Sequence, residues 1–198
     1  MIHSTVSIKE GLKELLHNMP QVLAAWEGGS AATGFLDEFS DLDLSIVIAD
    51  DDPEPIFRIL NEHFSSQYGI DRQFRMPEPT WHGMSQCFYL LKDCELYFYC
   101  DIAVVPAANP QKFTEPDRHG NALIWFDKTG VYTAENSSSE EREKLVQRVL
   151  TNSVVTDFLG IIELQKALAR GSWLSSQMNF QLFVNRHLIP LLNVKYRP

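Results

Sequence analysis

The chain has 198 residues, and its 26 acidic residues outnumber its 17 basic residues, which gives a formal net charge of −9. Such an acidic chain lacks the basic surface that broad nucleic-acid binding needs, so we do not expect a nucleic-acid partner. We find neither a long apolar span nor a secretion leader, and the three cysteines lack zinc-ligand spacing, so we expect a cytoplasmic protein with free thiols and no membrane association.

Helical and strand patterns alternate along the first two thirds of the chain. Apolar side chains at helical spacing predict helices over residues 8–19 and 56–64. Short apolar or alternating runs predict strands over residues 22–26, 42–48, 70–76, 86–92 and 95–105. The last two strands are close enough in sequence to form a hairpin.

A glycine-rich turn follows the first predicted strand. Gly28 and Gly29 allow backbone amides to approach a phosphate closely, and a short helix from Ser30 would direct free N–H groups towards an anion. The Ser30 hydroxyl would add a further donor. A Gly-Gly-Ser turn alone is usually a plain loop, so its meaning depends on what lies beside it.

Two aspartates open the strand predicted over residues 42–48. Residues two apart in a strand project from the same face, with backbones roughly 6.5–7 Å apart. Asp41 and Asp43 are therefore predicted to share one face, opposite the apolar side chains of this strand. Two such carboxylates suit Mg²⁺, which takes oxygen ligands and leaves the rest of its coordination shell to phosphate and water. An isolated Asp-x-Asp more often marks a strand start or a turn, but beside the glycine turn it indicates a nucleoside-triphosphate site.

A third aspartate, Asp101, lies in the middle of the strand predicted over residues 95–105. Aspartate is disfavoured inside strands, and burying a carboxylate is costly unless it is paired or binds a metal. A solvated strand edge or a nearby arginine would be the alternative explanation. We interpret Asp101 as a metal ligand or a catalytic carboxylate, because acids that remain inside strands are often found at functional sites.

Four other side chains near these strands have weaker signals. Tyr97 and Tyr99 are expected to share the strand face of Asp101, where they would border a base or acceptor pocket or simply pack. His82 and His119 fall in predicted loops and lack a partner at ligand spacing. We therefore interpret both as ordinary surface histidines.

The composition changes in a serine-rich segment near residue 136. Two serine–glutamate pairs there have capping-box spacing: Ser137 with Glu140, and Ser138 with Glu141. A long helix is expected to follow, and then a second helix over residues 172–188 that ends at Pro190. We therefore predict a core over residues 1–135 and a helical C-terminal region over residues 136–198.

Together, Gly29-Ser30, Asp41-x-Asp43 and Asp101 resemble the signature of the nucleotidyltransferase superfamily. The polymerase-β-like core of that superfamily carries Gly-Ser, a spacer, Asp-x-Asp and a later aspartate on a neighbouring strand. Within it, the chain is most similar to small bacterial aminoglycoside adenylyltransferases and minimal nucleotidyltransferases. The resemblance implies an α+β fold, with a mixed sheet flanked by helices and a short helical C-terminal region.

The resemblance also implies an activity: transfer of a nucleoside monophosphate, AMP from ATP, to a hydroxyl of a small molecule such as an aminoglycoside-like acceptor. Asp41, Asp43 and Asp101 would hold two Mg²⁺ ions, and Asp101 would be a candidate general base. Gly29 and Ser30 would bind the β- and γ-phosphates. Because the C-terminal region is short, the acceptor site is expected either to be incomplete or to be completed by a second subunit of a homodimer.

Two other functions remain open at this point. Minimal nucleotidyltransferases can modify a protein or RNA partner, as in toxin–antitoxin pairs, although the acidity of this chain disfavours RNA. The other alternative is a non-catalytic nucleotide-binding module. The presence of all three carboxylates argues against it.

Overall fold

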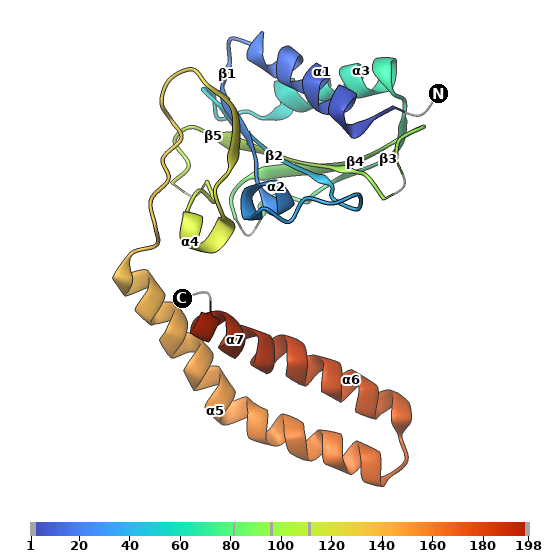
Figure 1. Cartoon of the computed structure of the whole chain (residues 1–198), viewed down its shortest axis with the longest axis vertical. Coiled ribbons are helices and arrows are strands. Elements are labelled where there is room, and N and C mark those ends of the chain that lie inside the picture. Colours follow the sequence, from blue (N-terminus) through green and yellow to red (C-terminus); the bar gives the residue numbers. More distant parts are fainter. Residues whose placement is uncertain (1–2, 81, 96, 111, 197–198) are drawn as a thin grey trace. The chain divides into compact units, whose positions relative to one another are not determined.

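Six strands form one mixed sheet in the computed structural model, which describes residues 3–80, 82–95, 97–110 and 112–196 (Figure 1). The strands are β1 (Val22–Glu27), β2 (Leu42–Ile48), β3 (Ile70–Arg75), β4 (Ser85–Leu91), β5 (Cys100–Pro106) and β6 (Leu123–Asp127). Their order is β3-β4-β5-β2-β1-β6, in which β2 and β5 run parallel and the other neighbours run antiparallel. The expected α+β class with a mixed sheet is confirmed.

Helices lie on both faces of this sheet. They are α1 (Thr5–His17), α2 (Gly29–Thr33), α3 (Glu54–Gln67) and α4 (Pro116–His119). Figure 1 shows α1 and α3 on one face of the sheet and α2 and α4 on the other. The two longer helices have ordinary start signals, since the Ser4 hydroxyl of α1 accepts the Ser7 N–H at 3.2 Å, and α3 begins with Glu54 and a proline.

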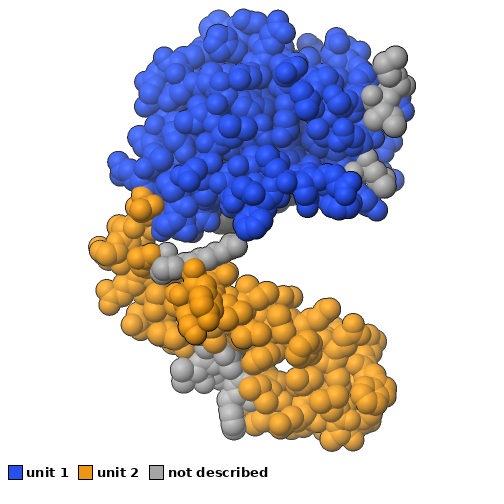
Figure 2. Space-filling view, in the orientation of Figure 1, with its two compact units in different colours: residues 1–135 blue, residues 136–198 orange. Residues whose placement is uncertain are grey.

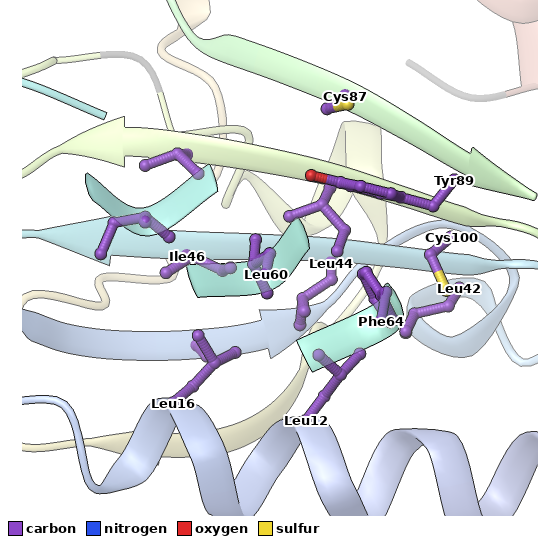
Figure 3. Close-up of a cluster of buried hydrophobic side chains, with 14 of the residues drawn as sticks. Leu12, Leu16, Leu42, Leu44, Ile46, Leu60, Phe64, Cys87, Tyr89 and Cys100 are labelled. Carbon is purple, nitrogen blue, oxygen red and sulfur yellow. The ribbon is translucent and has the colours of Figure 1, made fainter. Parts of the chain in front are cut away.

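The main core lies between the sheet and helices α1 and α3 (Figure 3). Leu12 and Leu16 of α1 and Leu60 and Phe64 of α3 are fully buried there. Every second residue of the central strands faces this layer; these residues are Leu42, Leu44 and Ile46 of β2, Cys87 and Tyr89 of β4, and Cys100, Ile102 and Val104 of β5. Because strand side chains alternate, the residues between them must point to the opposite face.

That opposite face is covered by a smaller apolar cluster. Ala24, Trp26, Val47, Met84 and Val105 are buried in it. The loop segments between β5 and residue 132 supply the side chains that pack over this cluster, which are Ala107, Phe113, Ala122, Val131 and Tyr132. The described residues of this layer cover part of the face and leave a cavity beside it.

Two expectations about the β4–β5 region need correction. The hairpin is confirmed, but β5 begins at Cys100, so neither Tyr97 nor Tyr99 is on the strand as predicted. Tyr97 has φ +72°, a left-handed backbone conformation that a strand does not contain. The predicted loop that contains His119 holds the short helix α4, which has Pro116 in its first turn.

The chain divides into two compact units, residues 1–135 and residues 136–198, at the position of the composition change (Figure 2). The second unit contains α5 (Ser139–Ala169), α6 (Trp173–Phe183), a π-helical segment (Val184–Leu188) and α7 (Ile189–Tyr196). At the start of α5, Ser138 and Glu141 form the capping box. In the part of the chain described by the structure, none of the helices combines the length and the apolar character that crossing a membrane requires.

The expected helix end at Pro190 is wrong. The helix continues to Tyr196, because the chain takes a π turn just before the proline, in which the N–H of Ile189 bonds to the carbonyl of Val184. This wider turn leaves room for a residue that lacks an N–H group.

Candidate functional site

A cavity of about 540 Å³ lies on the sheet face opposite α1 and α3. Its walls come from the start of α2, the middle of β2 and β5, the segment leading into β4, and the segment containing α4. The volume lies within the range of small-molecule sites. The cavity is therefore the candidate site in the first unit, and several of the predicted site residues line it.

Asp43 and Asp101 both line this cavity. They are direct register partners on the parallel strands β2 and β5, so their side chains leave the same face of the sheet at adjacent positions. Burial, together with the negative charges of Asp41 and Asp101, raises the pKa of Asp43 from 3.8 to about 6. The two strands thus bring together carboxylates that disfavour each other's charge.

Burial also raises the pKa of Asp101 above its ordinary value, while a hydrogen bond from Gln86 opposes that rise. The Gln86 amide nitrogen Nε2 donates this bond to Asp101 Oδ1 at 2.6 Å. The same carboxylate also responds to the charge of Asp41, which raises its pKa. Asp101 is therefore a half-buried acid held by a neutral donor, and no described residue forms a salt bridge with it.

Asp41 is the remaining carboxylate of the predicted Asp-x-Asp pair. It precedes β2, whose first residue is Leu42, and it is not among the described residues that line the cavity. A hydrogen bond with Asp41 raises the pKa of Tyr99 well above its ordinary value, and burial adds to this rise. Asp41 thus raises the pKa of Asp43 through its negative charge, although it is not among the described cavity-lining residues.

The glycine turn contacts the Asp43 side chain directly. Gly29 begins α2 with φ +52°, and a Cβ atom on it would lie 1.6 Å from Asp43 Oδ2. The N–H of Gly28 donates to the Asp43 carbonyl at 2.9 Å. Glycine at position 29 is therefore required both by the left-handed backbone and by the carboxylate beside it. Ser30 follows in the first turn of α2 but is not among the cavity-lining residues that the structure describes.

The interpretation of His82 as a surface residue is wrong. Its side chain lines the cavity, and the residue is only 7% exposed. His119 is half-buried and also lines the cavity, and burial lowers its pKa. Sequence spacing gave no signal for either residue, because the loops that carry them reach the site only through the tertiary fold.

Arg118 and Gln86 also line the cavity and were not identified from the sequence. Arg118 lies on α4, which is fixed against α2 by the Asn121 N–H, a donor to the Ala32 carbonyl at 2.9 Å. The approach at this point is close, since a Cβ atom on Gly120 would lie 2.5 Å from the same carbonyl oxygen. Among the described residues, no ion pair joins Arg118 to an acid, so its guanidinium remains available for an anionic ligand.

The carboxylates of the cavity suit a divalent cation. Within the described part of the chain, no group of three or more His, Cys, Asp or Glu side chains forms a ready-made metal site. Mg²⁺, however, is usually held by one or two carboxylates, with substrate phosphates and water as its other ligands. Asp43 and Asp101 provide two such carboxylates in one cavity, and a cation would relieve the repulsion between them. The residues therefore fit Mg²⁺ in kind and number.

No family model matches the chain, and no curated protein matches it. Its function is therefore inferred from the chemistry of the residues around the cavity.

Proposed function

We propose that the protein is a Mg²⁺-dependent nucleotidyltransferase with a polymerase-β-like core, which transfers AMP from ATP to a hydroxyl of a small molecule. One observation carries the proposal: Asp43 and Asp101 are register partners on adjacent parallel strands and face one cavity, with Gly29 against the Asp43 carboxylate. Paired carboxylates beside a glycine turn suit a metal–triphosphate ligand.

Asp43 and Asp101, with Asp41 beside them, are the residues that would hold Mg²⁺. When bound, Mg²⁺ neutralises charge on the phosphate oxygens and lowers the pKa of the acceptor hydroxyl. The protein's own contribution is to orient the carboxylates. The strand register fixes the spacing of Asp43 and Asp101, and the backbone bond from Gly28 fixes the strand beside α2.

Two features favour a triphosphate as the ligand. The N–H groups of Gly29 and Ser30 lie in the first turn of α2, where backbone N–H groups have no partner within the helix, and we assign them to the β- and γ-phosphates. Arg118 lines the same cavity and supplies a positive charge opposite in sign to the carboxylates. A ligand that carries a cation and several phosphates can bind both the free N–H groups of α2 and the Arg118 guanidinium.

In the proposed reaction, the acceptor oxygen forms a bond to the α-phosphorus of ATP. The bond from that phosphorus to the bridging oxygen breaks, and pyrophosphate leaves with its electron pair. The acceptor proton passes to the carboxylate of Asp101, which lines the same cavity. Catalysis then depends mainly on positioning and charge neutralisation.

The proposal is tested by measuring pyrophosphate release from ATP and Mg²⁺ with pooled aminoglycosides and other hydroxylated metabolites. We expect release with one acceptor pool, and we expect Asp43→Asn to abolish it. Asp51→Asn serves as the matched control, because Asp51 is an exposed aspartate away from the cavity.

Other outcomes would direct the search elsewhere. Release that persists in Asp43→Asn would refute the assigned site. Binding of Mg·ATP without release in any pool would favour a protein acceptor or a binding module, and a pull-down that recovers a stoichiometric partner would separate these two.

A further inference from the structure

A chain of hydrogen bonds connects the Asp101 carboxylate to the buried ring of His82. Gln86 lies on β4 opposite Ala103, so its side chain emerges on the sheet face of Asp101. Its Nε2 donates to Asp101 Oδ1 at 2.6 Å, and its Oε1 lies 3.2 Å from His82 Nε2. The side chains of Asp101, Gln86 and His82 all line the cavity.

The backbone of the same segment decides which ring nitrogen of His82 carries the proton. The N–H of Met84 donates to His82 Nδ1 at 3.2 Å, so Nδ1 is an acceptor. In the neutral ring the proton must then reside on Nε2, which faces Gln86. The Thr80 hydroxyl donates to the Met84 carbonyl at 2.5 Å and holds this segment in place.

The protonated Nε2 of His82 in turn decides which end of the Gln86 amide faces Asp101. With the amide as observed, its oxygen accepts from His82 and its nitrogen donates to the carboxylate. A reversed amide would place an oxygen against the carboxylate and an N–H₂ against the His82 N–H. Both contacts would be repulsive, so His82 excludes this orientation.

We propose that His82 is a positioning residue that orients Asp101 through Gln86. The hydrogen bond from Gln86 fixes Asp101 at its Oδ1 atom, and Oδ2 accepts no hydrogen bond from any described residue. The catalytic consequence rests on the proposed transfer reaction. In that reaction, Oδ2 of Asp101 is the atom that meets the acceptor hydroxyl. Removing the side chain of Gln86 or of His82 would leave the Asp101 carboxylate free to rotate.

The first test measures the tautomer directly and needs no turnover. Long-range ¹H–¹⁵N NMR at alkaline pH, without nucleotide or metal, should show the His82 ring protonated at Nε2. We expect Gln86→Met to shift the His82 Nε2 resonance. The matched variant Gln73→Met, which loses a side-chain bond from β3 to Cys87 beside Gln86 on β4, should leave it unchanged. A His82 ring protonated at Nδ1 in the wild type would overturn the proposal.

The second test is kinetic. Because partners that orient a reacting carboxylate typically matter by about 10–100-fold, we expect Gln86→Met and His82→Ala each to lower kcat by that factor. The KM for ATP should change little, since neither residue is assigned to the nucleotide. The double variant should be no slower than Gln86→Met alone, because His82 acts only through Gln86.

The outcomes separate the two proposals. Losses that multiply in the double variant would mean that His82 acts independently of Gln86, which would overturn the positioning role. Thermal unfolding checks that each variant folds, and His82→Gln replaces His82→Ala if the latter does not. A wild-type protein that releases no pyrophosphate would refute the proposed function, whereas the NMR result would still decide whether His82 orients Asp101.

Discussion

The two faces of the sheet use neighbouring residues of the same strands for different purposes. On the face covered by α1 and α3, residues such as Ile102 are fully buried in a continuous apolar core. On the other face, Asp101 is half-buried beside a cavity and bonded to Gln86. One face therefore supplies most of the apolar burial, and the other holds polar groups in an environment that raises carboxylate pKa values.

The comparison shows why the site can be precise although its groups are poorly solvated. The apolar core fixes the strands, and the strands fix the register of Asp43 against Asp101. Like-charge carboxylates beside each other are unfavourable in the absence of a cation. The covered face must supply the stability that the cavity face does not.

The largest expected effect lies on the cavity face. Asp43→Asn should reduce the proposed nucleotidyl transfer by at least about 1000-fold, because it removes a carboxylate that we assign to the Mg²⁺ ion, whose charge stabilisation contributes several kcal/mol. The variant should be at least as stable as the wild type in urea denaturation, since the repulsion with Asp41 and Asp101 is lost. A variant that retains full transfer would contradict the division between the faces.

The covered face should give the opposite result. Ile102→Ala, one residue after Asp101, should lower the free energy of unfolding by about 2–5 kcal/mol, because it leaves a cavity in the core. The transfer activity of the remaining folded protein should stay near the wild-type value. Denaturant titration measures the first quantity, and activity normalised to the folded fraction measures the second. Val6→Ala, an exposed position on α1, is the control.

A substitution at the glycine turn tests the contact between α2 and the cavity face. Gly29→Ala would force the Asp43 carboxylate away, and a displacement of about 1 Å can lower activity by about 100-fold. Gly34→Ala has the same kind of backbone strain at φ +78°, but its Cβ atom would meet nothing within 4 Å. Equal activity loss in both variants would show that backbone strain, not contact with Asp43, is responsible.

The smallest effect concerns pH. The pKa of Asp43 rises from 3.8 to about 6 on folding, so between these values the folded state binds more protons than the unfolded state. The contribution of Asp43 to stability is therefore present at low pH and is lost as pH rises through about 6. In chelator, the stability gain of Asp43→Asn over the wild type should increase from pH 4 to pH 7, by on the order of 1 kcal/mol after solvent screening. A gain that is constant with pH would mean that burial does not perturb this carboxylate.

The sequence by itself determined the local elements and the pattern of the central strands. Alternation in residues 42–48 separates apolar from polar side chains, and that periodicity is a property of every strand. The glycine turn, the capping box at Ser138 and the composition change near residue 136 are likewise local signals. Local signals failed at Tyr97 and Pro190, where a left-handed residue and a π turn depend on the surrounding chain.

Only the tertiary structure decided which polar residues meet. Asp43 and Asp101 are 58 positions apart (101 − 43), and the parallel pairing of β2 with β5 places them side by side. His82 and Arg118 reach the cavity on loops whose paths are set by packing against the sheet and α2. The physical reason is that periodicity and capping act over a few residues, whereas strand order and loop docking depend on contacts between distant parts of the chain.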